Sequence, residues 1–257
     1  MIRVMGNDKG MDKAGEVARY GGMRWFDVRW VLVVGMLGLP GRGMLQGQSL
    51  APEAPPAVSE YMGRTVAQTM HYAGAGWLIR NKRDREEGTL RMREALELKP
   101  GMVVCDLGSG NGYHSLPMAK AVAPAGKVLA VDIQPEMLEM LKERAAAQAV
   151  TNVECIVGEV HDPHLPEGSC DLVLLVDVYH EFSHPEVMLK AIRKALKPDG
   201  KVVLVEFRAE DLSVPIKPEH KMSKAQIMKE LEANGFALKR SFDELPWQHM
   251  LWFGKSE

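Results

Sequence analysis

Short apolar runs alternate with amphipathic stretches along the second half of the chain, and this alternation predicts strands and helices in turn. Apolar runs predict strands at 103–107, 127–132, 153–157, 171–176 and 201–206. Amphipathic stretches predict helices at 113–122, 135–148, 185–196 and 224–234, and two further strand-like pieces follow at 236–242 and 249–253. Strands that alternate with helices predict an α/β fold with a doubly wound, mostly parallel sheet.

The first half of the chain is patterned differently. Residues 1–22 carry little periodicity, whereas 23–51 resemble a secretory signal peptide, with arginines, an apolar run at 30–39 and a Ser-Leu-Ala cleavage site before Pro52. The apolar run is too short for a stable membrane span. An uncleaved anchor and a disordered extension are the alternatives, and Met23 is a second candidate start.

A helical cap is predicted between this segment and the sheet. Apolar residues at mixed three- and four-residue spacing predict a helix over 59–81, and a second amphipathic helix over 86–98 follows a charged run. We therefore expect a disordered or signal-like segment at 1–56, a helical lid at 57–98 and the main domain at 99–257.

Composition narrows the classes of function. The 257 residues carry a net charge of −2 and no basic patch interleaved with aromatic residues, so nothing supports a nucleic-acid partner. The three cysteines are odd in number, and two lie in apolar runs. Buried free thiols are expected rather than a disulfide framework.

A glycine-rich turn joins the first strand to its helix, with Asp106 ahead of Gly108, Gly110 and Gly112. Glycines adopt positive φ and leave no Cβ in the way, so a ligand can approach the backbone closely. A dinucleotide fingerprint requires Gly-x-Gly-x-x-Gly, but here Tyr113 stands where the third glycine belongs. The spacing disfavours a nicotinamide oxidoreductase, and Asp106 is suited to pair with a cationic amine.

A second acid supports a nucleotide-like ligand. The strand 127–132 ends in Asp132, which comes 20 residues after Gly112. A carboxylate at the end of the second strand of such a fold accepts hydrogen bonds from ribose hydroxyls.

The pattern Asp-x-Gly-x-Gly-x-Gly at 106–112 resembles motif I of the class I S-adenosylmethionine (SAM) methyltransferases, and the resemblance covers about residues 85–253. It implies a Rossmann-like, seven-stranded sheet with an antiparallel C-terminal hairpin and an N-terminal helical lid. It implies SAM as the cofactor, with contacts from Asp106, Gly108, Ser109, Gly110, Gly112, Asp132, Ile133, Glu159 and Asp177. A SAM enzyme is expected in the cytoplasm, whereas the signal-like segment suggests export, so the compartment stays open.

The segment Asp177–Phe182 follows the fourth strand and resembles the Leu-His-Asp-Trp segment of plant small-molecule O-methyltransferases. This resemblance implies that His180 is the general base and Glu181 the neighbouring acid. An imidazole suits the removal of a hydroxyl proton near neutral pH. Alternatively, His180 caps a helix or joins a polar network, and positioning alone accelerates transfer to an acceptor that is already nucleophilic.

Aromatic and polar residues at three further places are candidate contacts to a small-molecule acceptor. They lie in the predicted lid, after the fourth strand and beyond the fifth strand, and are Tyr72, Trp77, Tyr179, Glu206, Arg208 and His220. Lid packing and loop salt links are the alternative roles.

Six residues have side chains suited to metal ligation: His161, Asp162, His164, His180, Glu181 and His184. Their spacing matches no familiar ligand pattern, so no metal is predicted. We expect methyl transfer to a small molecule, with oxygen favoured as the methylated atom. The alternatives are a quinone-type C-methyltransferase, whose glycine loop is similar, and a non-catalytic SAM-binding sensor. The sequence leaves the oligomeric state open.

Overall fold

The computed structural model describes residues 54–257 and centres on a seven-stranded sheet in the order β5-β4-β3-β6-β7-β9-β8. Parallel pairing joins β3 (Val103–Leu107), β4 (Lys127–Asp132), β5 (Val153–Val157), β6 (Cys170–Val176) and β7 (Leu196–Phe207). The last two strands, β8 (Phe236–Phe242) and β9 (Gln248–Lys255), form an antiparallel hairpin that joins β7 through β9. The predicted sheet, mostly parallel with a C-terminal hairpin, is confirmed.

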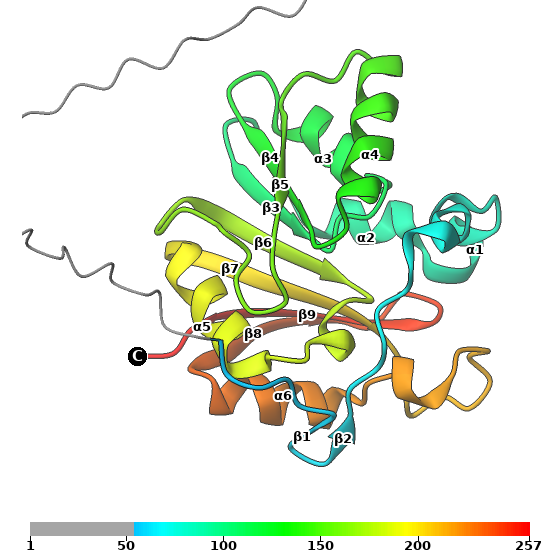
Figure 1. Cartoon of the computed structure of the whole chain (residues 1–257), viewed down its shortest axis with the longest axis vertical. Coiled ribbons are helices and arrows are strands. Elements are labelled where there is room, and N and C mark those ends of the chain that lie inside the picture. Colours follow the sequence, from blue (N-terminus) through cyan, green and yellow to red (C-terminus); the bar gives the residue numbers. More distant parts are fainter. Residues whose placement is uncertain (1–53) are drawn as a thin grey trace, which may run out of the picture. The chain divides into compact units, whose positions relative to one another are not determined.

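Helices cover both faces of this sheet (Figure 1). One face packs against α2 (Thr89–Ala95), α3 (Ser115–Val122) and α4 (Pro135–Ala147), and the other against α5 (Pro185–Ala195) and α6 (Lys224–Ala233). The apolar stripe of α5, with Met188, Leu189 and Ile192 buried, shows why a helix forms here, since these positions share one helical face. Strand β6 is apolar throughout its centre because both of its faces are covered.

The strand order reverses between β3 and β6, which are neighbours in the sheet although β4 and β5 intervene in the chain. In open α/β sheets, a crevice forms at the carboxyl ends of the strands where the order reverses, and ligands bind there. The fold therefore places the glycine loop after β3 and the segment after β6 on the two sides of one crevice.

The predicted helix over 59–81 is wrong in its first part. Residues 60–65 form a hairpin of β1 (Glu60–Tyr61) and β2 (Arg64–Thr65), and the helical η1 (Tyr72–Ile79) begins only at Tyr72. The hairpin turns at Met62 and Gly63, whose φ angles are 48° and 100°, outside the helical range. Apolar spacing suggested a helix, but these side chains belong to an extended backbone.

The predicted helix over 86–98 is also divided. Gly88 adopts a left-handed φ of 65° and separates α1 (Arg83–Glu87) from α2. A Cβ at Gly88 would lie 2.9 Å from Pro246 Cδ, so the close packing here requires glycine. Strand β7 likewise starts at Leu196 rather than at Lys201, because Leu196 already pairs with Cys170 across an irregularity in register.

Residues 54–71 run beside the segment that follows β6, and we call them the strap (Figure 1). The amide of Val58 donates to the carbonyl of Ser183 over 2.9 Å, and that of Ala67 donates to the carbonyl of His180 over 3.1 Å. Arg64 anchors the strap, since its guanidinium donates to the buried Glu230 on α6 and to the carbonyl of His180. The strap thus contains the β1–β2 hairpin, and its residues 64–70 line one side of the crevice.

The predicted signal-like segment at 23–51 lies outside the described residues. Within residues 54–257, no helix has both the length and the apolar character needed to cross a bilayer. The domain boundaries at 56 and 98 stay predictions.

Candidate active site

A cavity of about 1230 Å³ opens at the carboxyl ends of β3, β4 and β6. Its wall is formed by the glycine loop, the strap, the segment 176–183 after β6 and the loop 215–221. Six of the predicted cofactor residues line it: Gly108, Gly110, Asp132, Ile133, Glu159 and Asp177. The structure thus brings most of the predicted cofactor set to one surface.

Asp132 connects the end of β4 to the glycine loop. Its Oδ2 accepts a hydrogen bond from the Gly110 amide at 2.8 Å, and its Oδ1 accepts one from the Gln134 amide at 2.9 Å. Burial raises the pKa of this carboxyl, whereas the backbone hydrogen bonds act in the opposite direction. A carboxylate held in this way at the cavity wall fits the hydroxyl groups of a nucleoside.

The glycines of the loop are required by packing as well as by backbone conformation. Gly108 and Gly110 have φ of 75° and 51°. A Cβ on Gly108 would lie 2.5 Å from Val178 Cγ2, and one on Gly110 would lie 2.6 Å from Leu78 Cδ1. The free space that sequence analysis assigned to a ligand is therefore partly filled by the protein itself.

Three predicted cofactor residues do not line the cavity. Gly112 packs against Leu141, and Ser109 is buried with no hydrogen-bond partner for its Oγ among the described residues. Asp106 lies beneath the loop, where it accepts a hydrogen bond from Ser115 Oγ. Burial raises the pKa of Asp106 from 3.8 to about 6, with the Ser115 hydroxyl acting against it. Direct contact of these three residues with SAM stays a prediction.

Asp106 should make the folded protein less stable as the pH rises. The unfolded chain loses this proton near pH 3.8 and the folded chain near about 6, so unfolding is increasingly favoured between these values. The shift corresponds to roughly 3 kcal/mol. In urea unfolding, the stability of the wild type relative to Asp106→Asn should fall by about 2–3 kcal/mol between pH 4 and pH 7.

Asp199→Asn controls for the loss of one carboxyl, because Asp199 is exposed. If the free energy of unfolding of the wild type relative to Asp106→Asn stays constant or rises with pH, the raised pKa is contradicted.

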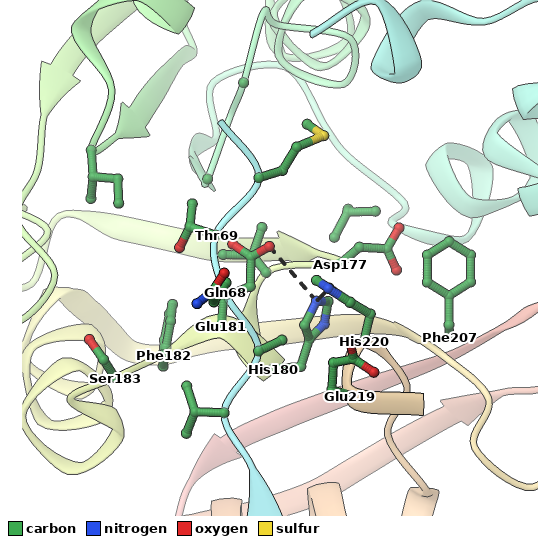
Figure 2. Close-up of a pocket in the computed structure, with 18 of the residues that line it drawn as sticks. Gln68, Thr69, Asp177, His180, Glu181, Phe182, Ser183, Phe207, Glu219 and His220 are labelled. Carbon is green, nitrogen blue, oxygen red and sulfur yellow. Dashed lines mark hydrogen bonds and ion pairs between the residues drawn. The ribbon is translucent and has the colours of Figure 1, made fainter. Parts of the chain in front are cut away.

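His180 lies on η2 (Tyr179–Glu181), directly after β6, and is almost fully buried. Its Nδ1 lies 2.6 Å from Glu206 Oε2, while its Nε2 faces the cavity, 3.1 Å from Nδ1 of His220 (Figure 2). Because a carboxylate only accepts, the pairing with Glu206 implies that Nδ1 carries the proton. Glu206 is held in turn, since its Oε1 accepts from the Tyr179 amide at 2.8 Å.

Burial and neighbouring charged groups shift the pKa values of His180, Glu181 and Asp177. Burial is the largest single influence and lowers the pKa of His180, but Glu206, with smaller contributions from Glu181 and Asp177, raises it, and the net pKa lies above its usual value. Burial raises the pKa of Glu181 to about 7, with His180 opposing the rise. The pKa of Asp177 is raised well above its usual value by burial and by nearby carboxylates.

The predicted acceptor residues divide into two groups. Trp77 and His220 line the cavity, and the guanidinium of Arg80 lies 3.7 Å from the centre of the Trp77 ring. The remaining four, Tyr72, Tyr179, Glu206 and Arg208, do not line it.

Each of these four has another role in the structure. Tyr179 is fully buried, and its hydroxyl donates to Glu230 at 2.7 Å. Glu206 holds His180, and Arg208 donates to backbone carbonyls at 243 and 246. Tyr72 is held through its amide by Gln134. A position after a strand end predicted proximity to the site but not the direction of the side chain.

Several cavity residues were missed by sequence reasoning. The strap contributes Gln68, Thr69 and Met70, which carried no recognisable motif. Phe207 also lines the cavity, and its position directly after Glu206 was the available signal. Asp177, already predicted, adopts a φ of 56° and accepts two hydrogen bonds from Gln248, which anchor its strained backbone.

The six residues weighed for a metal do not converge as a set. His161 and His164 lie 3.2 Å and 3.9 Å from the carboxylate of Glu159. His184 instead pairs with the Pro55 carbonyl and with Ser183. His180 and Glu181 come together with His220.

Comparison with known proteins agrees with the fold. The family described as "Methyltransferase domain" matches residues 98–251. A SAM-dependent methyltransferase from Aquifex aeolicus aligns with a TM-score of 0.68 and 24% identity, over 72% of this chain and 98% of that one. This chain belongs to the methyltransferase domain family. It carries a class I SAM-dependent methyltransferase domain, as motif I predicts.

Two curated relatives give the range of reactions in similar proteins. The protein-L-isoaspartate O-methyltransferase of Ignicoccus hospitalis is 33% identical over 102 residues, 40% of this chain and 47% of its own. The ubiquinone/menaquinone biosynthesis C-methyltransferase UbiE of Cupriavidus necator is 29% identical over 110 residues, 43% of this chain and 45% of its own. The chain thus spans less than half the length of these relatives.

Proposed function

We propose that the domain transfers the methyl group of SAM to an oxygen atom of a small-molecule acceptor, with His180 as the general base. The observation that supports this most strongly is the pairing of buried His180 with Glu206 at 2.6 Å, with Nε2 turned to the cavity. SAM, when bound, supplies an electrophilic methyl group on a sulfonium.

The cofactor is held on the β3–β4 side of the cavity. Asp132 binds the ribose hydroxyls, and Glu159 lies on the same wall for the adenine amino group. The backbone at Gly108 and Gly110 faces the same space. The fixed position of Asp132 supports this assignment, because hydrogen bonds from Gly110 and Gln134 prevent the carboxylate from turning away.

Proton removal follows from the tautomer of His180. With Nδ1–H donated to Glu206, the lone pair of Nε2 accepts the hydroxyl proton of the acceptor once the acceptor displaces His220 Nδ1, which lies 3.1 Å away. The carboxylate of Glu206 then stabilises the imidazolium that forms and keeps the ring oriented. Glu206 is a positioning residue, since it acts through His180.

Water exclusion comes from the strap and from the apolar side chains opposite it. Met70 and Phe207 line the cavity from the strap and from the end of β7. A bound acceptor is thus enclosed beside His180, and alignment with the methyl group contributes to the rate.

The test is a methylation assay of the full chain with methyl-labelled SAM and a panel of phenols, catechols and aliphatic alcohols. Label is expected on an oxygen of at least one acceptor, with an equal amount of S-adenosylhomocysteine. Saturable SAM binding without S-adenosylhomocysteine over the whole panel would favour a SAM-binding sensor instead.

The similarity to UbiE favours a second candidate, C-methylation of a quinone precursor. The same assay with a dihydroxylated aromatic acceptor separates the two, because mass fragmentation distinguishes a ring methyl from a methyl ether. A ring methyl as the main product would replace the O-methyl proposal.

A further inference from the structure

Three potential metal ligands from two separate segments meet in the cavity. The donor atoms are Nε2 of His180, Nδ1 of His220 and a carboxylate oxygen of Glu181, and all lie within 4.8 Å of one another. His180 Nε2 is 3.1 Å from His220 Nδ1 and 3.9 Å from Glu181 Oε1. Figure 2 shows Glu181 and His220 beside His180, and both contacts are made to its Nε2.

We propose that His180, Glu181 and His220 form a binding site for a divalent transition-metal ion of the zinc class. Two imidazole nitrogens and one carboxylate oxygen are a donor set that Zn²⁺ prefers at sites that keep one position open. Ligand atoms of a tetrahedral zinc ion lie roughly 3.3 to 3.6 Å apart, given bonds of about 2.0 to 2.2 Å. The separation of His180 from His220 lies just below that range, and its separation from Glu181 lies just above it.

Glu206, which contacts Nδ1 of His180, supports the metal site independently of these separations. Metal-binding histidines usually donate their second N–H to a carboxylate, which fixes the ring and its tautomer. Glu206 accepts this bond from Nδ1 at 2.6 Å and is itself fully buried and fixed by the Tyr179 amide. His180 is therefore oriented as a ligand before an ion arrives.

A simple hydrogen bond between His180 and His220 also fits their 3.1 Å separation. It does not require the third group, whereas Glu181, whose side chain is only 14% exposed, lies 3.9 Å from the same His180 nitrogen and also accepts from the Thr69 hydroxyl and the Met70 amide. A metal ion uses all three groups, and the cavity supplies its open position.

One consequence of the site rests on the proposed function. An Nε2 lone pair that binds an ion cannot accept a proton, so a bound ion should inhibit methyl transfer that depends on His180 as the base. The existence of the site does not rest on that function, since binding is measured without SAM or acceptor.

The experiment titrates the full chain, stripped with EDTA and dialysed, with Zn²⁺ in competition with a chromogenic chelator. One equivalent is expected to bind with a Kd in the micromolar range or tighter. Glu181→Gln and His220→Asn should each weaken binding at least about tenfold, and Glu206→Gln about 10- to 100-fold. His161→Asn is the matched control, because His161 also lies beside a carboxylate.

Co²⁺ gives a readout that needs no variant, since four-coordinate Co²⁺ has intense visible absorption. Absence of stoichiometric Zn²⁺ binding by the folded wild type would overturn the site. The site would also be overturned if His161→Asn abolished Zn²⁺ binding while Glu181→Gln and His220→Asn still bound the ion. Tight Zn²⁺ binding without inhibition of methyl transfer would keep the site and remove His180 as the base.

Discussion

Replacement of His180 by alanine is expected to lower kcat about 1000-fold while SAM affinity stays within a few fold of the wild type. A positioned general base contributes about 100- to 10,000-fold, and His180 is the base in the proposed reaction. The ring faces the part of the cavity next to the strap, whereas Asp132 and Glu159 lie on the cofactor side. The assay measures S-adenosylhomocysteine formation in the presence of EDTA, and calorimetry measures SAM binding.

A double-mutant cycle separates the base from its partner. Glu206→Gln keeps the shape of the side chain and should lower kcat less than His180→Ala does. Adding Glu206→Gln to His180→Ala should cause no further loss, because Glu206 acts only through the missing ring. Independent losses that multiply, or turnover retained in His180→Ala, would remove the dyad from the mechanism.

Replacement of Asp132 by alanine is expected to weaken SAM binding about 100-fold, or roughly 2.7 kcal/mol. Hydrogen bonds to a charged group are worth about 1.5–3 kcal/mol each, and the variant also releases the Gly110 amide. Isothermal titration with SAM and with S-adenosylhomocysteine measures the effect, which should be similar for both because they share the ribose.

Asp132→Asn is the matched variant, since it keeps the size of the side chain and one acceptor oxygen, and its loss should be smaller. Thermal unfolding of both variants without ligand shows whether the loop still folds. An Asp132→Ala protein that is folded and binds SAM as the wild type does would contradict the ribose assignment.

Most of the sheet could be predicted because strands buried on both faces are marked by continuous apolar runs. Strand β5 has the predicted bounds, and β6 starts one residue earlier than predicted. The strap could not be predicted, because its hydrogen bonds go to the carbonyls of His180 and Ser183, more than a hundred residues away. Side-chain spacing alone did not reveal that Met62 and Gly63 turn the chain.

The sequence predicted which residues lie near the cavity better than it predicted what their side chains contact. Asp132 and His180 follow strand ends, and the fold brings both to the cavity. Glu206 also lies at a strand end, but its side chain faces inward and binds His180 rather than an acceptor. The meeting of His220 with His180 depends on the path of a loop 40 residues away and left no local signal.

The strap lies outside the stretch that matches the family, since residues 54–71 precede the match at 98–251. Asp132 and the glycine loop lie within the match, whereas part of the cavity wall comes from the strap outside it. If the proposed function holds, a change in the strap is expected to alter acceptor preference more than SAM binding. A chimera that exchanges only the strap is the natural route to altered selectivity.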